Sequence, residues 1–192
     1  MKRQHKAWMC MAIACCAAMM ISCSGQADNQ QKELMTAGNP YLPLWEHIPD
    51  GEPYVFEDPD NPGQFRVYIY GSHDSMISGY CRRELVVWSA SVNDLIHWRY
   101  DGEIFKVDKN ANGDPLSRLG VADVLYAPDV TQGPDGRYYL YYVLDKLSIV
   151  SVAVCDTPAG NYEFLGYVHY PDGTLLGEKE GDEPQFDPGV LL

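Results

Sequence analysis

Short segments in which apolar and polar residues alternate follow one another from residue 52 to residue 168. Such period-two alternation, rich in Val, Ile, Tyr and Trp, predicts β-strands with one buried face. Clusters of Gly, Pro, Asn and Asp separate the segments and predict tight turns. The pattern predicts an all-β fold without intervening helices, with strands over residues 52–57, 65–71, 85–91, 98–104, 127–131, 137–144, 148–155 and 162–168.

The eight predicted strands form two groups of four that repeat the same order. When the chain is aligned with itself, Tyr68-Ile69-Tyr70 falls on Tyr139-Leu140-Tyr141, and residues 86–102 lie over residues 150–166 without a gap. Four-stranded units that recur about every 60 to 70 residues are typical of a β-propeller, whose first strands line a central channel. Two consecutive sheets of a β-sandwich would give a similar repeat. An Asp before the first strand of each unit favours the propeller.

A third unit begins at Phe186-Asp187-Pro188-Gly189-Val190. The leading carboxylates Asp50, Asp129 and Asp187 follow one another at intervals close to one unit each, so the repeat brings them toward one cavity. Because a β-propeller needs at least four blades to close, we expect two blades and the start of a third, with the rest absent. The unpaired sheet edge and apolar blade face of such a piece predict poor solubility.

The first 22 residues differ from the rest and predict a secretory signal peptide. Three basic residues precede an uncharged apolar run, residues 7–21, that is too short to span a bilayer. The run ends at Ser22-Cys23-Ser24, which resembles a bacterial lipobox and predicts lipidation of Cys23. The alternative is that Cys23 is one more cysteine of a cysteine-rich leader that is cleaved away. Residues 23–38 are polar and predict a flexible tether, so the propeller domain should cover residues 39–192.

The chain of 192 residues has a formal net charge of −13, and removal of residues 1–22 leaves 11 basic and 27 acidic residues. Such an acidic surface argues against nucleic acid as a partner. An acidic surface is compatible with neutral sugars as ligands. Residues 108–114 are rich in Asp and Asn but lack the Glu that completes a calcium loop, so we expect no metal, and no motif predicts a cofactor. Cys81 and Cys155 are expected to be two half-buried thiols in strands, or alternatively one disulfide.

The leading carboxylates suit glycoside hydrolysis. In that reaction one carboxylic acid protonates the leaving oxygen and a second carboxylate activates water. An Asp that precedes a strand can instead accept backbone N–H bonds and cap a turn, and for any single Asp this is the plainer interpretation. Equivalent positions in three units favour the catalytic interpretation.

Five motifs of the chain together resemble glycoside hydrolase family 43. They are Asn39-Pro40 with Asp50, Tyr68-Ile69-Tyr70-Gly71-Ser72, Val87-Trp88-Ser89-Ala90-Ser91 followed by Asp94-Leu95 and Trp98, Tyr126-Ala127-Pro128-Asp129-Val130, and Phe186-Asp187-Pro188-Gly189. The resemblance implies a five-bladed β-propeller enzyme that hydrolyses arabinose- and xylose-containing glycans with inversion. It also implies an oligo- or polysaccharide as the partner of the site.

When the family's site residues are matched to this chain motif by motif, the resemblance implies that Asp50 is the general base that activates water. It also implies that Asp129 is the carboxylate that tunes the pKa of the proton donor and holds the donor in place. The family's general acid is a Glu beyond the Asp-Pro motif of the third blade. No residue of this chain matches it, so we expect the chain as written to be inactive. The residues expected to contact sugar are Trp45, His47, His73, Asp74, Tyr126 and Asp187. Core packing for Trp45 and a turn at His73-Asp74 remain the alternatives.

These features predict an exported glycosidase held at the bacterial cell envelope by an N-terminal lipid, which would be its only contact with the membrane. A surface lipoprotein that binds glycans without cleaving them would share the leader, the acidity and the aromatic strands. A propeller that serves only as a protein-interaction scaffold would not need inner aspartates.

Overall fold

A computed structural model describes residues 38, 40–74, 80–107, 124–145 and 148–191, which belong to one unit, Leu34–Leu192. The predicted signal peptide, Cys23, nearly all of the predicted tether and the loop 108–114 lie outside the described residues. The strands are β1 (Glu52–Glu57), β2 (Phe65–Ser72), β3 (Glu84–Ser91), β4 (Asp94–Lys106), β5 (Asp129–Gln132), β6 (Tyr138–Val143), β7 (Val150–Cys155) and β8 (Glu163–Tyr167).

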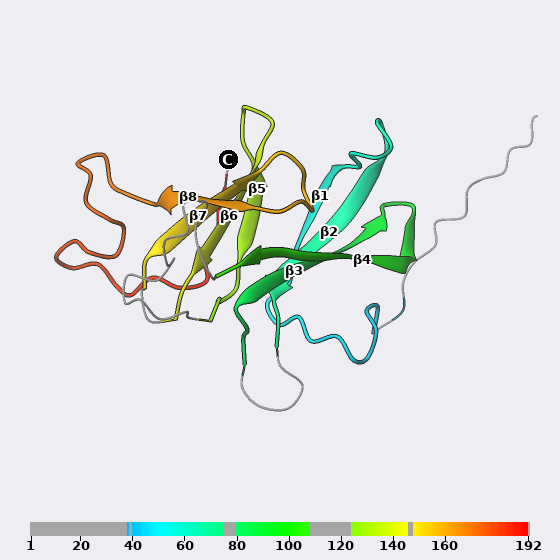
Figure 1. Ribbon diagram of the computed structural model, residues 1–192, viewed down its shortest axis with the longest axis horizontal. Helices are drawn as coiled ribbons and strands as arrows, with labels where there is room; N and C mark the ends of the chain where they lie inside the picture. The colour runs from blue at the N-terminus through cyan, green and yellow to red at the C-terminus, as the bar shows by residue number, and fades with distance from the viewer. Residues whose placement is uncertain (1–37, 39, 75–79, 108–123, 146–147, 192) are drawn as a thin grey trace, which may run out of the picture. The chain divides into compact units, whose positions relative to one another are not determined.

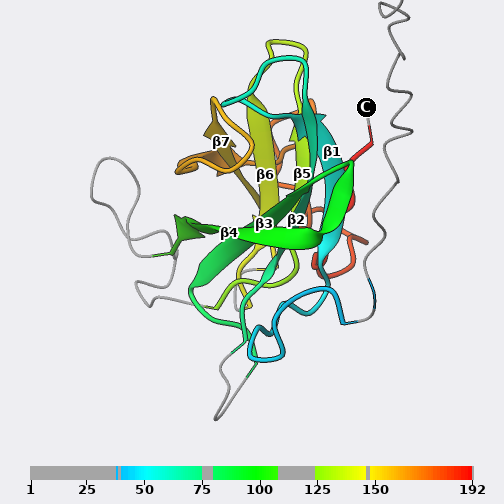
Figure 2. The same cartoon turned by 90° about the vertical axis from the view of Figure 1, so that its right-hand side faces the viewer.

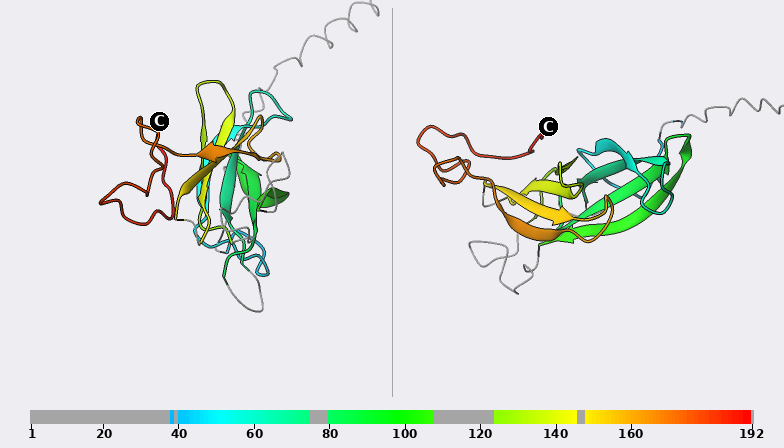
Figure 3. Two further views of the ribbon diagram at one scale, coloured as in Figure 1. Left: turned by 60° about the vertical axis from the view of Figure 1, so that its left-hand side comes forward. Right: turned by 90° about the horizontal axis from the view of Figure 1, so that it is seen from above.

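The strands form two antiparallel sheets of four, each in chain order, β1-β2-β3-β4 and β5-β6-β7-β8 (Figure 1). The first strand of the second sheet, β5, lies against β1 and β2 of the first sheet. Farther out, the N–H of Tyr162 before β8 donates to the carbonyl of Ile104 in β4, at 2.8 Å. The inner strands of the two sheets, β1 and β5, therefore lie beside each other, and so do the outer strands, β4 and β8, as in neighbouring propeller blades (Figures 2 and 3). The predicted all-β fold with two blades is confirmed.

Every predicted strand is present, and all the predicted boundaries except one agree with the structure within two residues. The exception is β4, which begins at Asp94 rather than at Trp98. Ser91 pairs with Asp94, so a hairpin with only Val92 and Asn93 at its tip joins β3 to β4. Asn93 and Asp94 are residues that favour a turn, but Asp94 and Leu95 already belong to the ladder.

The same irregularity occurs at the outer edge of both sheets. Gly102 of β4 pairs with Val87, and Gly166 of β8 pairs with Val152; the register shifts directly after each of these pairs. A shift of this kind is a β-bulge, which increases the local twist of a strand. The alignment of residues 86–102 with residues 150–166 places one glycine on the other, whereas it places Val87 one position before Val152. The two units therefore repeat in structure as well as in sequence. In the third strands, the residues that are equivalent by strand pairing differ by one position from those that the sequence alignment matches.

One hydrophobic cluster joins the two sheets. Aromatic pairs cross the interface: Phe56 lies edge-on to Tyr138 at 5.0 Å between ring centroids, and Phe105 lies 4.7 Å from Tyr142. Burial of large side chains of this kind dominates the energetics of a core. The cluster consists of Tyr68, Tyr70, Leu85, Val87, Ile104, Phe105, Val107, Leu125, Val130, Tyr138, Leu140, Tyr142, Leu144, Ala153 and Tyr162.

Buried tyrosine hydroxyls fix how the sheets meet. The hydroxyl of Tyr70 on β2 donates to the carbonyl of Pro158, between β7 and β8, at 2.7 Å, and the hydroxyl of Tyr162 donates to the same carbonyl at 3.1 Å. Burial raises the pKa of both phenols well above the usual range, so both stay protonated donors. Any slide of one sheet past the other would break the bond from Tyr70 and leave its buried hydroxyl unpaired, which is costly.

The segment before β1 packs on the face of the first sheet opposite the second. The ring of Trp45 packs on Trp88 at 5.9 Å, and the buried carboxylate of Glu46 accepts the indole N–H of Trp88 at 2.8 Å. Ile48 fills the space beside Gly71, where a side chain would collide with it. The Pro-rich segment before β1 therefore packs along the first sheet.

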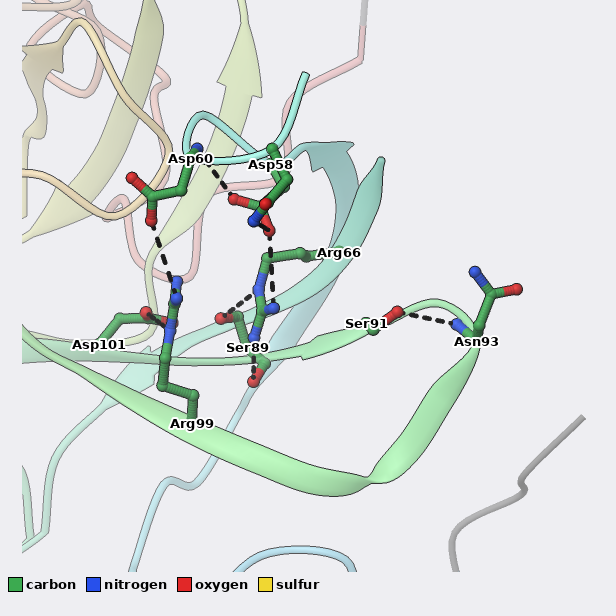
Figure 4. Close-up of polar contacts among 9 residues, drawn as sticks. Asp58, Asp60, Arg66, Ser89, Ser91, Asn93, Arg99 and Asp101 are labelled. Atoms are coloured by element: carbon green, nitrogen blue, oxygen red, sulfur yellow. Dashed lines mark hydrogen bonds and ion pairs between the residues drawn. The ribbon is translucent and has the colours of Figure 1, made fainter. Parts of the chain in front are cut away.

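A cluster of charged side chains fixes the turn between β1 and β2 (Figure 4). Asp58 is only 3% exposed and lies 3.7 Å from Arg66, whose guanidinium also donates to the hydroxyl and the carbonyl of Ser89 at 3.0 and 3.1 Å. Burial by itself would raise the pKa of Asp58. Hydrogen bonds from Asn61 and a backbone amide, with the positive charges of two arginines, outweigh burial and lower it. The carboxylate of Asp58 therefore stabilises the turn between β1 and β2.

Residues 168–191 leave β8, form a small hairpin and return to the second sheet (Figure 3). The hairpin is closed by a bridge between His169 and Leu175, and Asp182 accepts the backbone N–H groups of Gly177 and Lys179, both at 2.9 Å. At the end, the N–H of Val190 donates to the carboxylate of Asp129. Over the described residues, no helix has the length and hydrophobicity needed to cross a membrane.

Replacement of Tyr70 by Phe should lower the free energy of unfolding by about 1 to 2 kcal/mol, because the carbonyl of Pro158 then keeps only the longer bond from Tyr162. Tyr139→Phe is the matched control, since the hydroxyl of Tyr139 bonds to exposed Asp135; its effect should stay below about 0.5 kcal/mol. Urea unfolding followed by circular dichroism measures both. Equal effects of the two substitutions would contradict a special role of the Tyr70 bond.

Candidate active site

A cavity of about 480 Å³ is lined by segments from both sheets and from the C-terminal segment. It lies where the chain enters β1, where it enters β3, where it enters β5, and where it passes from β6 to β7. Its lining residues are Asp50, Tyr80, Cys81, Tyr126, Ala127, Asp145, Ser148, Pro184, Gln185, Phe186 and Asp187. The cavity thus collects residues that are far apart in sequence at the ends of neighbouring strands.

Backbone strain gathers in this lining. Four described residues other than glycine have a positive φ: Asp50 (54°), Cys81 (53°), Ser148 (49°) and Asp187 (45°). All four line the cavity. A left-handed backbone is unfavourable for residues with a Cβ, and such residues cluster at functional sites, where the surrounding structure holds them. The distribution of strain therefore marks this cavity, among the described parts of the chain, as the candidate active site.

Two of the predicted carboxylates, Asp50 and Asp187, share the cavity. Burial and the negative charge of Asp50 raise the pKa of Asp187 above its ordinary value of 3.8. A like charge close by disfavours ionisation, which is how pairs of carboxylates divide acid and base roles between them. Asp145, at the end of β6, is a third carboxylate of the lining.

Asp129 lies outside this lining. It is the first residue of β5 and only 2% exposed. One of its carboxylate oxygens accepts the N–H of Val130 at 2.8 Å, and the other accepts the N–H of Val190. The phenol of Tyr54 on β1 also bonds to Asp129, and burial together with this bond raises the pKa of Tyr54 to about 12. Asp129 thus links three segments, and its predicted role toward a proton donor stays a prediction.

The other predicted sugar contacts divide into two groups. Tyr126 lines the cavity, and its ring stacks on Tyr80 at 6.4 Å between centroids. Trp45, His47, His73 and Asp74 are not among the lining residues. Trp45 and His47 belong to the packed segment before β1; His73 contacts the carboxylate of Glu46 at 3.1 Å, and Asp74 accepts the N–H of Cys81 at 2.6 Å. A role of these four residues in binding sugar likewise stays a prediction.

Sequence reasoning did not find Tyr80, Cys81, Asp145 or Ser148. For Asp145 a signal existed, because the alignment that superposes the second strands of the two units also places Asp74 on Asp145. The backbone confirms the equivalence: the N–H of Asp74 donates to the carbonyl of His47 at 3.0 Å, and that of Asp145 donates to Val124 at 3.3 Å. Cys81 and Ser148 have no such signal, since their role depends on backbone conformation.

The chemistry of the lining is that of carboxylates, hydroxyls and aromatic rings. Burial and the neighbouring charges of Asp74, Asp50 and Asp187 raise the pKa of the Cys81 thiol, although a hydrogen bond from Ser72 opposes this, so the thiol stays protonated at neutral pH. Among the described residues, no group of three or more His, Cys, Asp or Glu side chains has the arrangement of a metal site.

Comparison with known proteins gives a clear relative. A xylosidase/arabinosidase of Thermoclostridium stercorarium is 62% identical over 154 residues, which make up 80% of this chain and 30% of that protein. The extracellular endo-α-(1→5)-L-arabinanase 2 of Bacillus subtilis (strain 168) is 28% identical over 134 residues, 65% of this chain and 25% of that protein. The chain thus spans less than a third of the length of these curated relatives.

Among solved structures, a β-1,3-galactosidase of family GH43, crystallised with galactodeoxynojirimycin, matches 62% of this chain and 33% of its own, with a TM-score of 0.46 and 21% identity. No family model matches the chain. The high identity to the xylosidase/arabinosidase confirms, over the matched residues, the resemblance to glycoside hydrolase family 43 that the motifs carry.

Proposed function

We propose that this chain forms part of the active site of a glycosidase that hydrolyses arabinose- and xylose-containing glycans. The observation that carries the proposal is the cavity in which Asp50 and Asp187 meet on strained backbone. The names of the two curated relatives, a xylosidase/arabinosidase and an arabinanase, supply the substrate class. Hydrolysis with inversion is the reaction proposed, with water as the nucleophile.

Asp50 is proposed as the general base. It precedes β1, is exposed to the cavity and has Asp187 as its charged neighbour. Asp187 is the better supported partner carboxylate, because it lines the cavity with Asp50 and because burial and the charge of Asp50 raise its pKa, whereas Asp129 is occupied by two backbone N–H groups. Asp129 contributes by holding Val190, three residues after Asp187, and so fixes the segment that carries the partner carboxylate.

The lining also favours neutral sugars. Three carboxylates, Asp50, Asp145 and Asp187, face the cavity, and the described residues that line it include no Lys, Arg or His. A uronic acid in this cavity would bring a further negative charge into an acidic environment without a cationic partner in that lining, which is unfavourable. Pentoses such as arabinose and xylose carry no charge and avoid this cost.

Replacement of Asp50 by Asn should abolish hydrolysis while the fold persists, since Asn tolerates a left-handed backbone as well as Asp does. Because the chain spans less than a third of its relatives, we would insert residues 39–192 in place of the matching segment of the xylosidase/arabinosidase. The chimera should hydrolyse 4-nitrophenyl α-L-arabinofuranoside or β-D-xylopyranoside, and Asp50→Asn should reduce kcat by about 10²- to 10⁴-fold.

Asp60→Asn is the control for the chimera, because Asp60 is exposed in the turn between β1 and β2. An Asp50→Asn chimera as active as the Asp60→Asn chimera would remove the general base from the proposal. An inactive chimera that still binds the sugars would favour the alternative, a glycan-binding protein without catalysis.

Replacement of Asp187 by Asn should stabilise the chain in a pH-dependent way. The raised pKa means that ionisation of Asp187 costs more in the folded than in the unfolded state, so Asp187 lowers stability once the pH exceeds the unfolded value near 3.8. The variant and the unaltered chain should melt together at low pH, and the variant should melt higher above the raised pKa. Thermal unfolding from about pH 3 to about pH 7 measures the difference; a gap that is constant with pH would contradict the coupling.

We further propose that residues 1–22 direct export and that Cys23 carries the lipid anchor. The support is the order of basic, apolar and small residues that ends at Cys23. Expressed in a bacterium with labelled palmitate, the chain should incorporate the label, and Cys23→Ser should abolish incorporation. Cys16→Ser should leave it intact. Label retained in the Cys23→Ser chain, or absent from the unaltered one, would refute lipidation at this position.

A further inference from the structure

The geometry points to Tyr80 as an aromatic wall of the cavity against which a sugar ring stacks, held in position by Asp74. This inference rests on the proposed function, since it assumes that the cavity takes a glycan. It assigns a role to Tyr80, which the sequence motifs do not mark, and gives Asp74 a different role from the sugar contact predicted above.

Tyr80 is exposed to the cavity although it has a packed neighbour. Its side chain is 65% exposed and lines the same cavity as Asp50 and Asp187. Its ring stacks on Tyr126, with 6.4 Å between centroids and 15° between planes. A hydrogen bond between the two hydroxyls, together with burial, raises the pKa of Tyr126 to about 12. A ring that is fixed on one side and solvated on the other offers a preformed flat apolar surface.

Most other exposed aromatic residues of the described chain lie elsewhere, although Phe186 also lines the cavity. Trp45 and Tyr100 both pack on Trp88, and Tyr41 packs on Trp98, all on the first sheet and the segment before it. None of these residues lines the cavity. Exposed aromatic residues scattered singly need no explanation, whereas one that lies in a cavity beside a few polar groups matches the composition of small-molecule sites.

The backbone around Tyr80 is fixed by one local and one long-range hydrogen bond. The N–H of Cys81 donates to a carboxylate oxygen of Asp74 at 2.6 Å, and Cys81 has a φ of 53°. The carbonyl of Arg82 accepts the N–H of Leu125, from the segment before β5, at 2.9 Å. Asp74 thus stabilises the left-handed turn that directs Tyr80 into the cavity. We therefore treat Asp74 as a positioning residue that acts through Cys81.

A sugar presents an apolar face of C–H groups, which packs on the face of an aromatic ring, while its hydroxyl groups need carboxylate acceptors at the edge. The cavity supplies both in one place, with Tyr80 as the ring and Asp50, Asp145 and Asp187 as acceptors. The substrate part recognised here is a neutral sugar unit. Removal of the ring should therefore weaken binding without removing the carboxylates.

The test is titration of the whole purified chain with xylobiose and with α-(1→5)-linked arabinotriose by calorimetry. Tyr80→Ala should raise Kd roughly threefold to tenfold, whereas Tyr80→Phe should bind like the unaltered chain because the ring remains. Tyr100→Ala is the matched control, since Tyr100 is also an exposed tyrosine but lies outside the lining, and it should leave Kd unchanged.

Asp74 gives a second test with a conservative pair. Asp74→Ala removes the acceptor of the Cys81 N–H and should raise Kd as Tyr80→Ala does, while Asp74→Asn keeps an acceptor oxygen and should restore binding. The double variant of Tyr80→Ala and Asp74→Ala should bind no more weakly than either single variant, because both act through one ring. Additive losses would mean that Asp74 contacts the sugar directly.

A spectroscopic readout separates stacking from a general loss of structure. Sugar C–H protons that lie over an aromatic face shift upfield, and this shift in the NMR spectrum of bound xylobiose should vanish in Tyr80→Leu, which keeps an apolar side chain of similar reach. If the unaltered chain binds a sugar and Tyr80→Ala binds it equally well, this inference is overturned and the proposed function stands. If the unaltered chain binds neither sugar, both fall.

Discussion

The packing of one sheet flat on the other, with inner strand beside inner strand, is the constraint on which the candidate site depends. Phe56, Tyr70 and Tyr138 fix this arrangement by ring contacts and by the buried bond to Pro158. Once the sheets are held so, the segments that enter equivalent strands must converge at the same end of both sheets. The cavity is therefore a consequence of the repeat, because each unit contributes to its lining the segments that enter equivalent strands.

The strained residues show how regular that contribution is. Asp50 precedes β1, whereas Cys81 and Ser148 precede the third strand of their respective sheets. Each unit thus reaches the cavity through a left-handed residue just before a strand. The left-handed turn ends one segment and redirects the chain into the next, and the cost of an unfavourable φ is offset by hydrogen bonds such as that from the Cys81 N–H to Asp74.

Much of the fold could be predicted from the sequence, because period-two alternation and turn residues are local signals, and the Tyr-rich strands of both units have them. The start of β4 was missed because pairing of Ser91 with Asp94 overrides the tendency of Asn93 and Asp94 to form a turn. Three residues of the cavity were predicted from their place before strands: Asp50, Tyr126 and Asp187. Asp145 could have been predicted from the repeat. Tyr80 could not, since its position depends on a bond between Arg82 and Leu125, which belong to the segments before β3 and β5.

The leading carboxylates show most clearly where local pattern stops being sufficient. Asp129 and Asp187 were both predicted to lead a strand. Asp129 belongs to the ladder of β5, where backbone N–H groups occupy both oxygens, whereas Asp187 has a φ of 45° and lines the cavity. Pro188 follows Asp187, and a residue before proline favours the extended region, so the sequence argues against this conformation. The carboxylate that reaches the cavity is therefore the one whose backbone is held against its local preference, and that distinction arises only from tertiary contacts.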